Sequence, residues 1–156
     1  MKVDKTGIDF IHSFEGCSLK PYLCPANVPT IGWGNTFYPN GVKVTMKDKE
    51  ITQAEADNLF LFVLAMFERD VSGLVTSIVS QNQFNALVSF AYNVGSDIDQ
   101  DNIPEGLGDS TLLKKVNINP NDPTIANEFA KWNKSNGKPL PGLTRRRFEE
   151  SQMYFK

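Results

Sequence analysis

The feature that most constrains the fold is a change of pattern at residue 52. Over residues 19–44, prolines and glycines interrupt short runs of β-forming residues, which predicts a small antiparallel sheet with residues 38–41 ("YPNG") as a turn. From Thr52 onward the pattern becomes helical. Thr52 and Glu55 form the capping-box pattern T-x-x-E ahead of a long apolar segment. The sequence therefore predicts an α+β fold in which a sheet region precedes a larger helical region.

A first helix is predicted before the sheet. Apolar residues recur at helical spacing over residues 8–14, Thr6 can cap the N-terminus, and Gly16 can end the helix in the left-handed conformation. Glu15 is then expected on the last turn of this helix, where the chain enters the sheet region.

The helical region is predicted to contain a central helix and three shorter ones. Ser80 and Gln83 form a second capping box before "FNALVSFAYNVG", and Gly95 can end that helix. Asp122 and Pro123 have the residue types of a helix start. The shorter helices are expected at residues 110–117, 122–133 and 143–156, and residues 96–109 and 137–142 are expected to be loops.

Length and charge exclude several classes of protein. The 156 residues suit one domain or two small lobes that share a core. A net charge of −2 gives no basic field for a nucleic-acid partner. The basic cluster at residues 143–150 ("LTRRRFEE") is interpreted as a solvated helix face. The N-terminus has no secretory or anchor pattern, and the longest apolar run, residues 59–67, is too short to span a membrane.

The chain has two cysteines, Cys17 and Cys24. If residues 19–23 are extended at about 3.3 Å per residue, the two alpha carbons lie about 20 Å apart. A disulfide needs less than about 7 Å. We therefore expect two free thiols.

Five blocks of the sequence together resemble one known family. The segment "FEGCSLKPYLCPANVPTIGWGNT" matches the pattern E-x8-(D/C)-x5-T at Glu15, Cys24 and Thr30. The blocks "ITQAEADNLF", "QFNALVSFAYNVG", "STLLKKVN" and "KWNKSNGKPLPGLTRRRFEE" follow in the same order as in that family. The chain resembles the phage-type lysozymes of glycoside hydrolase family 24, bacteriophage endolysins, over nearly its whole length.

The resemblance implies a lysozyme-like architecture. An N-terminal helix and sheet lobe would occupy residues 1–51, a connecting helical region residues 52–79 and a helical lobe residues 80–156, with the substrate cleft between the lobes. It also implies a monomer that acts on bacterial peptidoglycan by hydrolysing the β-1,4 bond between N-acetylmuramic acid and N-acetylglucosamine. The enzyme would stay in the host cytoplasm until lysis and reach the wall through a holin pore. No cofactor is implied.

The resemblance also implies catalytic roles. Glycoside cleavage needs a proton for the leaving oxygen and stabilisation of an oxocarbenium-like centre. Glu15 would be the general acid, and Thr30 would hold the attacking water. Cys24 stands where aspartate is commoner in the family. Its sulfur could activate water as a thiolate base, attack the sugar as a nucleophile, or do neither.

Candidate substrate contacts lie in the second lobe. Tyr92 and Asn93 match the "F/Y-N-V-G" segment that faces the cleft in the family; Tyr92 could stack on a sugar and Asn93 could bind an N-acetyl group or ring hydroxyl. Thr111 is a further candidate. Arg145 is the best match for the arginine that reaches the catalytic glutamate, although Arg146 and Arg147 leave the register open by one or two positions.

Three other features are expected to play no catalytic role. His12, the only histidine, is expected to face solvent and cannot form a metal site alone. The run "DIDQD" resembles the start of a calcium loop, but Asn102 and Gly108 stand where glycine and glutamate are required, so no metal is expected. Asn35, where the family often has histidine, is expected to affect stability or lobe closure.

Two alternatives to hydrolysis stay open. A lytic transglycosylase needs one acidic residue and no water-activating partner, which suits a site without a second carboxylate. A non-catalytic wall-binding protein could have kept the fold after losing the aspartate.

Overall fold

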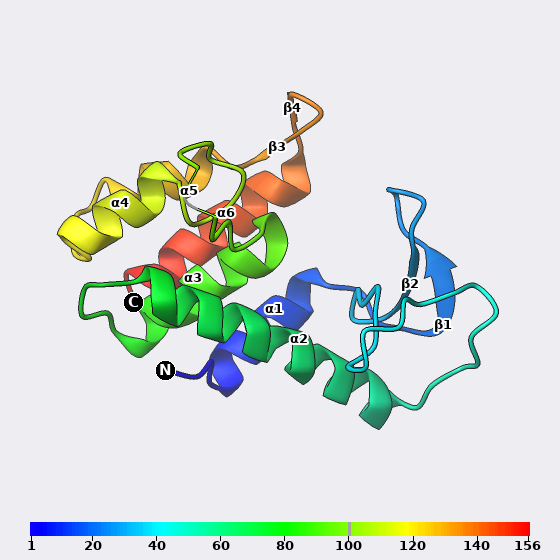
Figure 1. The fold of residues 1–156 in the computed structure, drawn as a ribbon. Coiled ribbons are helices and arrows are strands. Elements are labelled where there is room, and N and C mark those ends of the chain that lie inside the picture. Colours follow the sequence, from blue (N-terminus) through cyan, green and yellow to red (C-terminus); the bar gives the residue numbers. More distant parts are fainter. Residues whose placement is uncertain (100) are drawn as a thin grey trace. The chain divides into compact units, whose positions relative to one another are not determined.

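The computed structural model describes residues 1–99 and 101–156, which form two compact units (Figure 1). One unit comprises Asp9–Met66, and the other comprises Met1–Ile8 together with Phe67–Lys156. Two helices, α1 (Lys5–Phe14) and α2 (Gln53–Leu74), contribute residues to both units. The helices and short antiparallel sheets confirm the α+β class.

The sheet of the first unit is a two-stranded antiparallel ribbon. Strand β1 (Ser18–Leu23) pairs with β2 (Pro29–Gly32), and the register shifts between Ser18 and Tyr22. The predicted turn at residues 38–41 is confirmed, because the Gly41 N–H donates to the Tyr38 carbonyl oxygen over 2.9 Å and Gly41 has a φ of 82°.

A small apolar core holds this unit together. Ile31, Val44 and Leu59 are buried and pack with the half-buried Tyr38 and Ile51. Asn35 lies in the same region with 3% of its surface exposed, and its Nδ2 donates to the Leu59 carbonyl oxygen over 3.2 Å. Asn35 therefore joins the sheet region to α2 by a buried hydrogen bond.

The two capping boxes are confirmed, but the ends predicted for α1 are wrong. The Thr52 N–H donates to Glu55 Oε2 over 2.7 Å, and the Glu55 N–H donates to Thr52 Oγ1 over 3.2 Å. The cap of α1 is Asp4, whose Oδ1 accepts the N–H of the third residue of the helix over 3.0 Å; it is not Thr6. Gly16 does not have a positive φ angle, so it does not end α1 in the left-handed conformation.

The second unit is built around α3 (Gln81–Val94). Its residues 83–91 are all buried, and it packs against α6 (Pro141–Tyr154). Around them lie α4 (Thr111–Ile118) and α5 (Ile125–Ala130), and α5 packs against both α4 and α6. The predicted central helix and its Gly95 end are confirmed, since Gly95 has a φ of 104°.

A hairpin before α6 was predicted only as a loop. Strands β3 (Lys134–Ser135) and β4 (Lys138–Pro139) pair antiparallel. They are joined by Asn136 and Gly137, whose φ angles of 49° and 75° suit a two-residue hairpin turn.

The acidic loop before α4 is organised by one carboxylate. Asp97 Oδ2 accepts the backbone N–H groups of Glu105, Gly106 and Asp109 over 3.1–3.3 Å. Side-chain oxygens of Asp97, Asp99 and Asp109 lie within 4.8 Å of one another. The backbone hydrogen bonds give the Asp97 carboxylate a structural role that requires no bound ion.

None of the helices in the described residues combines the length and the apolar character that crossing a lipid bilayer requires.

Candidate active site

Glu15 lies directly after α1, as predicted. Its backbone N–H still donates to the Ile11 carbonyl oxygen over 3.1 Å, so the residue continues the geometry of the last turn. The side chain is half-buried. The α1 helix therefore fixes the position of the Glu15 backbone.

Cys24 and Thr30 come together because the β1–β2 ribbon folds back between them. Cys24 opens the connecting turn: its N–H donates to the Val28 carbonyl oxygen over 3.1 Å, and its carbonyl oxygen accepts the Asn27 N–H over 2.8 Å. Thr30 pairs with Tyr22 across the ribbon and has 2% of its surface exposed. The ribbon thus fixes Thr30 and leaves the Cys24 thiol half-exposed.

The turn favours the thiolate form of Cys24. Backbone hydrogen bonding, from Val28 above all, lowers the pKa of the Cys24 thiol from its ordinary value, and the Thr30 hydroxyl contributes in the same direction. Thr30 Oγ1 also donates to the Val28 carbonyl oxygen over 2.9 Å. A hydroxyl has one proton, so Thr30 must release that carbonyl when it donates to the sulfur.

Tyr22 is a neighbour of this site that the sequence analysis missed. Burial raises the pKa of its phenol, and the charges of Cys24 and Glu15 raise it further, which places both groups within electrostatic reach of one ring. The signal that could have found it is strand alternation, since residues 22 and 24 project toward the same side of an extended chain.

The two cysteines are both free, as predicted. Cys17 is exposed, and its Sγ lies 3.7 Å from Gln53 Nε2. Cys17 therefore takes no part in the turn around Cys24.

His12 does not face solvent, and that prediction is wrong. Its ring stacks on Trp33 with a centroid distance of 3.8 Å and an interplanar angle of 3°, and it lies 4.2 Å from the ring of Phe60. The Trp33 Nε1 in turn donates to Asp57 Oδ1 over 2.8 Å. His12 Nε2 is buried and has no hydrogen-bond partner among the described residues.

We expect this burial to make the folded unit less stable in acid. Burial lowers the pKa of His12 below its ordinary value of 6.5, against the opposing charges of Asp57, Asp9 and Glu15. The unfolded chain therefore binds a proton at higher pH than the folded chain does. The stability linked to His12 is present above pH 6.5 and is lost as the pH falls from 6.5 toward the lowered value. In His12→Gln, the difference between the melting temperatures at pH 8 and pH 5 should be smaller than in wild type. An unchanged difference would contradict the role of His12 in the pH dependence.

The predicted substrate contacts of the helical unit lie at the ends of helices. Tyr92 is half-buried against Phe67, with ring centroids 5.2 Å apart. Asn93 is exposed, and its Oδ1 accepts a hydrogen bond from Arg147 Nη2 over 2.9 Å. Thr111 is exposed at the first position of α4. All three stay predictions as substrate contacts.

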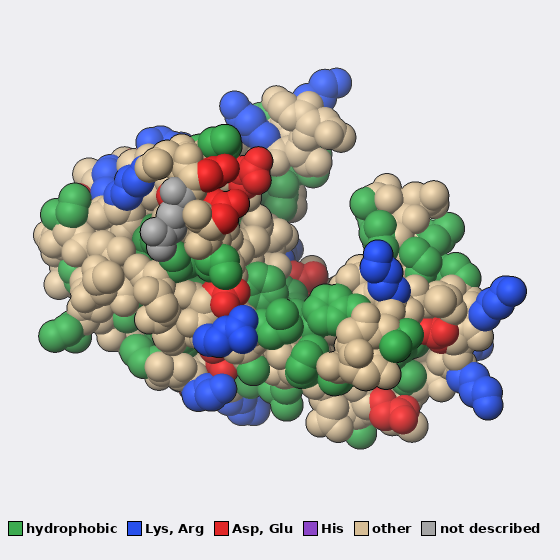
Figure 2. Space-filling model, viewed as in Figure 1, with side chains coloured by type: hydrophobic (Ala, Val, Ile, Leu, Met, Phe, Trp, Pro, Cys, Tyr) green, Lys and Arg blue, Asp and Glu red, His purple; other side chains and the backbone are tan. Residues whose placement is uncertain are grey.

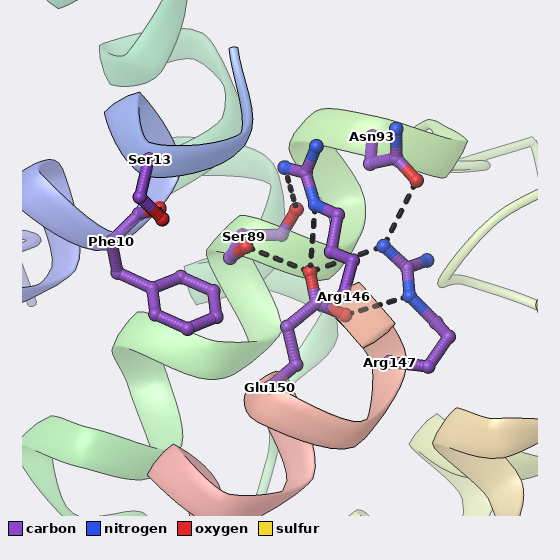
Figure 3. A network of polar contacts seen from close by, with 7 residues as sticks. All are labelled: Phe10, Ser13, Ser89, Asn93, Arg146, Arg147 and Glu150. Carbon is purple, nitrogen blue, oxygen red and sulfur yellow. Dashed lines mark hydrogen bonds and ion pairs between the residues drawn. The ribbon is translucent and has the colours of Figure 1, made fainter. Parts of the chain in front are cut away.

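The three arginines of α6 have different environments, and Figure 3 shows those of Arg146 and Arg147. Arg145 is exposed, and its Nε lies 3.2 Å from Glu149 Oε1. Arg146 and Arg147 are buried and both pair with the fully buried Glu150. The interpretation of this cluster as a solvated helix face is therefore wrong for Arg146 and Arg147. The role predicted for Arg145 beside Glu15 stays a prediction.

The chain has the elements of a lysozyme-like fold in order, namely α1 followed by Glu15, the β1–β2 ribbon, the long α2 and the helical unit around α3. The model of the family described as phage lysozyme matches residues 12–150, and the chain belongs to that family. It is 38% identical over 154 residues to the endolysin of Bacillus phage B103, covering 99% of this chain and 54% of that protein. It is 31% identical over 151 residues to the endolysin of Salmonella phage P22, covering 97% of each.

Solved structures agree with this assignment. An endolysin from Escherichia coli O157:H7 phage FAHEc1 is 32% identical with a TM-score of 0.84, covering 100% of this chain and 94% of that one. The muramidase domain of SpmX from Asticaccaulis excentricus is 33% identical with a TM-score of 0.75, covering 99% and 98%. The chain spans about half the length of the Bacillus phage endolysins that it matches.

Proposed function

We propose that this chain hydrolyses the β-1,4 bond between N-acetylmuramic acid and N-acetylglucosamine in bacterial peptidoglycan, for cell lysis. The observation that carries the proposal is the placement of Glu15 beside α1 with Cys24 and Thr30 across one short ribbon, at the spacing of the family pattern. The endolysin and muramidase names of similar proteins support this substrate class.

The proposed reaction assigns one step to each group. The Glu15 carboxyl group donates its proton to the glycosidic oxygen as the bond to the anomeric carbon breaks. A water molecule bonds to that carbon, Thr30 orients the water, and the Cys24 thiolate accepts its proton. If Cys24 instead attacks the sugar, water hydrolyses the glycosyl-thiol intermediate with Glu15 as base.

The remaining contacts belong to the same proposal. Tyr92, Asn93 and Thr111 would bind the glycan, and Arg145 would support Glu15. The protein would accumulate in the host cytoplasm as a monomer, without a cofactor, and reach the wall through a holin pore.

A lytic transglycosylase is the second candidate, because no carboxylate stands at position 24. Both reactions would use Glu15, but they leave different products. Hydrolysis adds water and gives a reducing N-acetylmuramic acid end, whereas transglycosylation closes a 1,6-anhydro ring and gives a product one water lighter. We expect mass spectrometry of digested, purified peptidoglycan to show reducing ends. Anhydro ends would favour the transglycosylase, and an undigested wall with bound protein would favour a non-catalytic wall-binding protein.

A further inference from the structure

A cavity of about 430 Å³ lies in the helical unit, between the end of α3 and the β3–β4 hairpin. Its apolar lining comes from Val94, Leu143 and Trp132. Its polar lining includes Asn93, and Lys134 and Ser135 of the hairpin. The lysines of this hairpin are exposed, and the tip projects from the surface in Figure 2. All the residues that line the cavity belong to the same unit.

One buried arginine determines how Asn93 presents its amide to this cavity. Arg147 has no exposed surface, its Nε lies 2.9 Å from Glu150 Oε2, and its guanidinium lies 4.9 Å above the ring of Phe90. Its Nη2 donates to Asn93 Oδ1 over 2.9 Å. A guanidinium has donors and no acceptor, so only the amide oxygen can face it.

The amide nitrogen of Asn93 therefore points away from Arg147, as Figure 3 shows. This nitrogen has no hydrogen-bond partner among the described residues, while the oxygen is occupied by Arg147. A neutral amide could otherwise turn over and offer either atom to a ligand. The fixed guanidinium removes that freedom, because turning the amide would place two N–H donors against a buried cation.

The rest of the cavity offers donors as well. The Lys134 ammonium forms no ion pair with the described carboxylates. Lys131, also at the cavity, is already held by Glu128 over 2.7 Å. The described residues that line the cavity include no carboxylate. A ligand that fits this lining must present acceptor oxygens beside an apolar face that can lie on Trp132.

We propose that Arg147 is a positioning residue that locks the Asn93 amide as a hydrogen-bond donor, so that this cavity selects substrate groups carrying a carbonyl or carboxylate oxygen. The inference rests on the proposed function for the identity of the ligand. In peptidoglycan, such oxygens belong to the acetamido groups of the glycan and to the carboxylates of the stem peptide.

Asn93→Asp tests the inference directly. The aspartate keeps an oxygen for Arg147 and adds an ion pair, so the melting temperature should stay equal or rise. It has no N–H, so binding should weaken about tenfold, the scale of one hydrogen bond lost to an unpaired acceptor. Binding is measured by co-sedimentation in the Glu15→Gln background, so that cleavage plays no part. Binding equal to that of the parent would overturn the proposal.

A comparison of Arg147→Lys with Ser89→Ala separates the positioning of Asn93 from a general loosening of the buried network. A lysine ammonium cannot hold both Glu150 and Asn93 in fork geometry, so Arg147→Lys should weaken binding several-fold. Ser89 is buried, and its hydroxyl donates to Glu150 Oε1 over 2.7 Å, whereas the Asn93 amide oxygen is bonded to Arg147. Ser89→Ala should lower the melting temperature and leave binding unchanged. Equal losses of binding in the two variants would show that general loosening of the network explains the effect, and would overturn the proposal.

Two ligands identify the source of the oxygen. If the variants lose binding only to intact peptidoglycan, the acceptor oxygen belongs to the stem peptide. If they lose binding equally to amidase-treated, peptide-free glycan strands, the oxygen belongs to the acetamido groups. If the Glu15→Gln parent binds neither ligand, the proposal is overturned. If wild type cleaves nothing but the variants still lose binding, the proposed hydrolysis fails and the inference stands.

Discussion

Glu15→Gln is expected to lower the rate of peptidoglycan cleavage by about 10²–10⁴-fold, the usual contribution of a general acid. The glutamine side chain has nearly the same shape but no acidic proton for the glycosidic oxygen. Glu15 lies directly after α1, and glutamine keeps the hydrogen bond from the backbone N–H to the Ile11 carbonyl oxygen. The measurement is the release of reducing ends from purified peptidoglycan, with the melting temperature recorded in parallel.

Glu50→Gln is the matched control for this substitution. Glu50 lies in the same unit, is exposed and reaches Lys20 only over 3.9 Å, an arrangement that contributes little to stability. We expect its activity to stay within about twofold of wild type, since surface substitutions away from a site have small effects. If Glu15→Gln and Glu50→Gln are equally active, Glu15 is not the general acid, and the non-catalytic wall-binding alternative gains support.

Local sequence signals predicted the helical framework well. The capping box of α3 and the glycine at its end act within one turn, so Ser80, Gln83 and Gly95 were sufficient to place that helix. The hairpin β3–β4 was missed although Asn136 and Gly137 form the usual two-residue turn. Its strands have only two residues each, too few for an alternating pattern to show.

Interactions between distant residues explain the errors. A run of charged residues usually lies on a surface, but Arg146 is buried because Glu150 and the Ser89 carbonyl oxygen accept its hydrogen bonds. Ser89 lies 57 residues earlier in the chain. His12 was assigned to solvent for the same reason, since Trp33 covers it only after the chain has folded back. Spacing within the first ribbon, by contrast, correctly predicted that Cys17 and Cys24 are free thiols.

Substitutions at Cys24 are expected to separate the three possible roles of its sulfur. Cys24→Asp should stay active, because a carboxylate can accept the proton of the attacking water. Cys24→Ala should lose activity on the order of 10²-fold, the lower end of a general-base contribution, and Cys24→Ser should fall close to Cys24→Ala, because a hydroxyl is far less acidic than a thiol. Full activity in Cys24→Ala would show that the sulfur has no catalytic role.

The pH profile gives a second readout on the same variants. The turn lowers the pKa of Cys24 below its ordinary value of 9.0, so a thiolate-dependent wild type should lose activity as the pH falls through that lowered value. An aspartate, with a usual pKa of about 3.9, should extend activity to lower pH. The anomeric configuration of the first product then distinguishes base from nucleophile. Inversion means that Cys24 activates water, whereas retention in wild type combined with inversion in Cys24→Asp means that the sulfur bonds to the sugar.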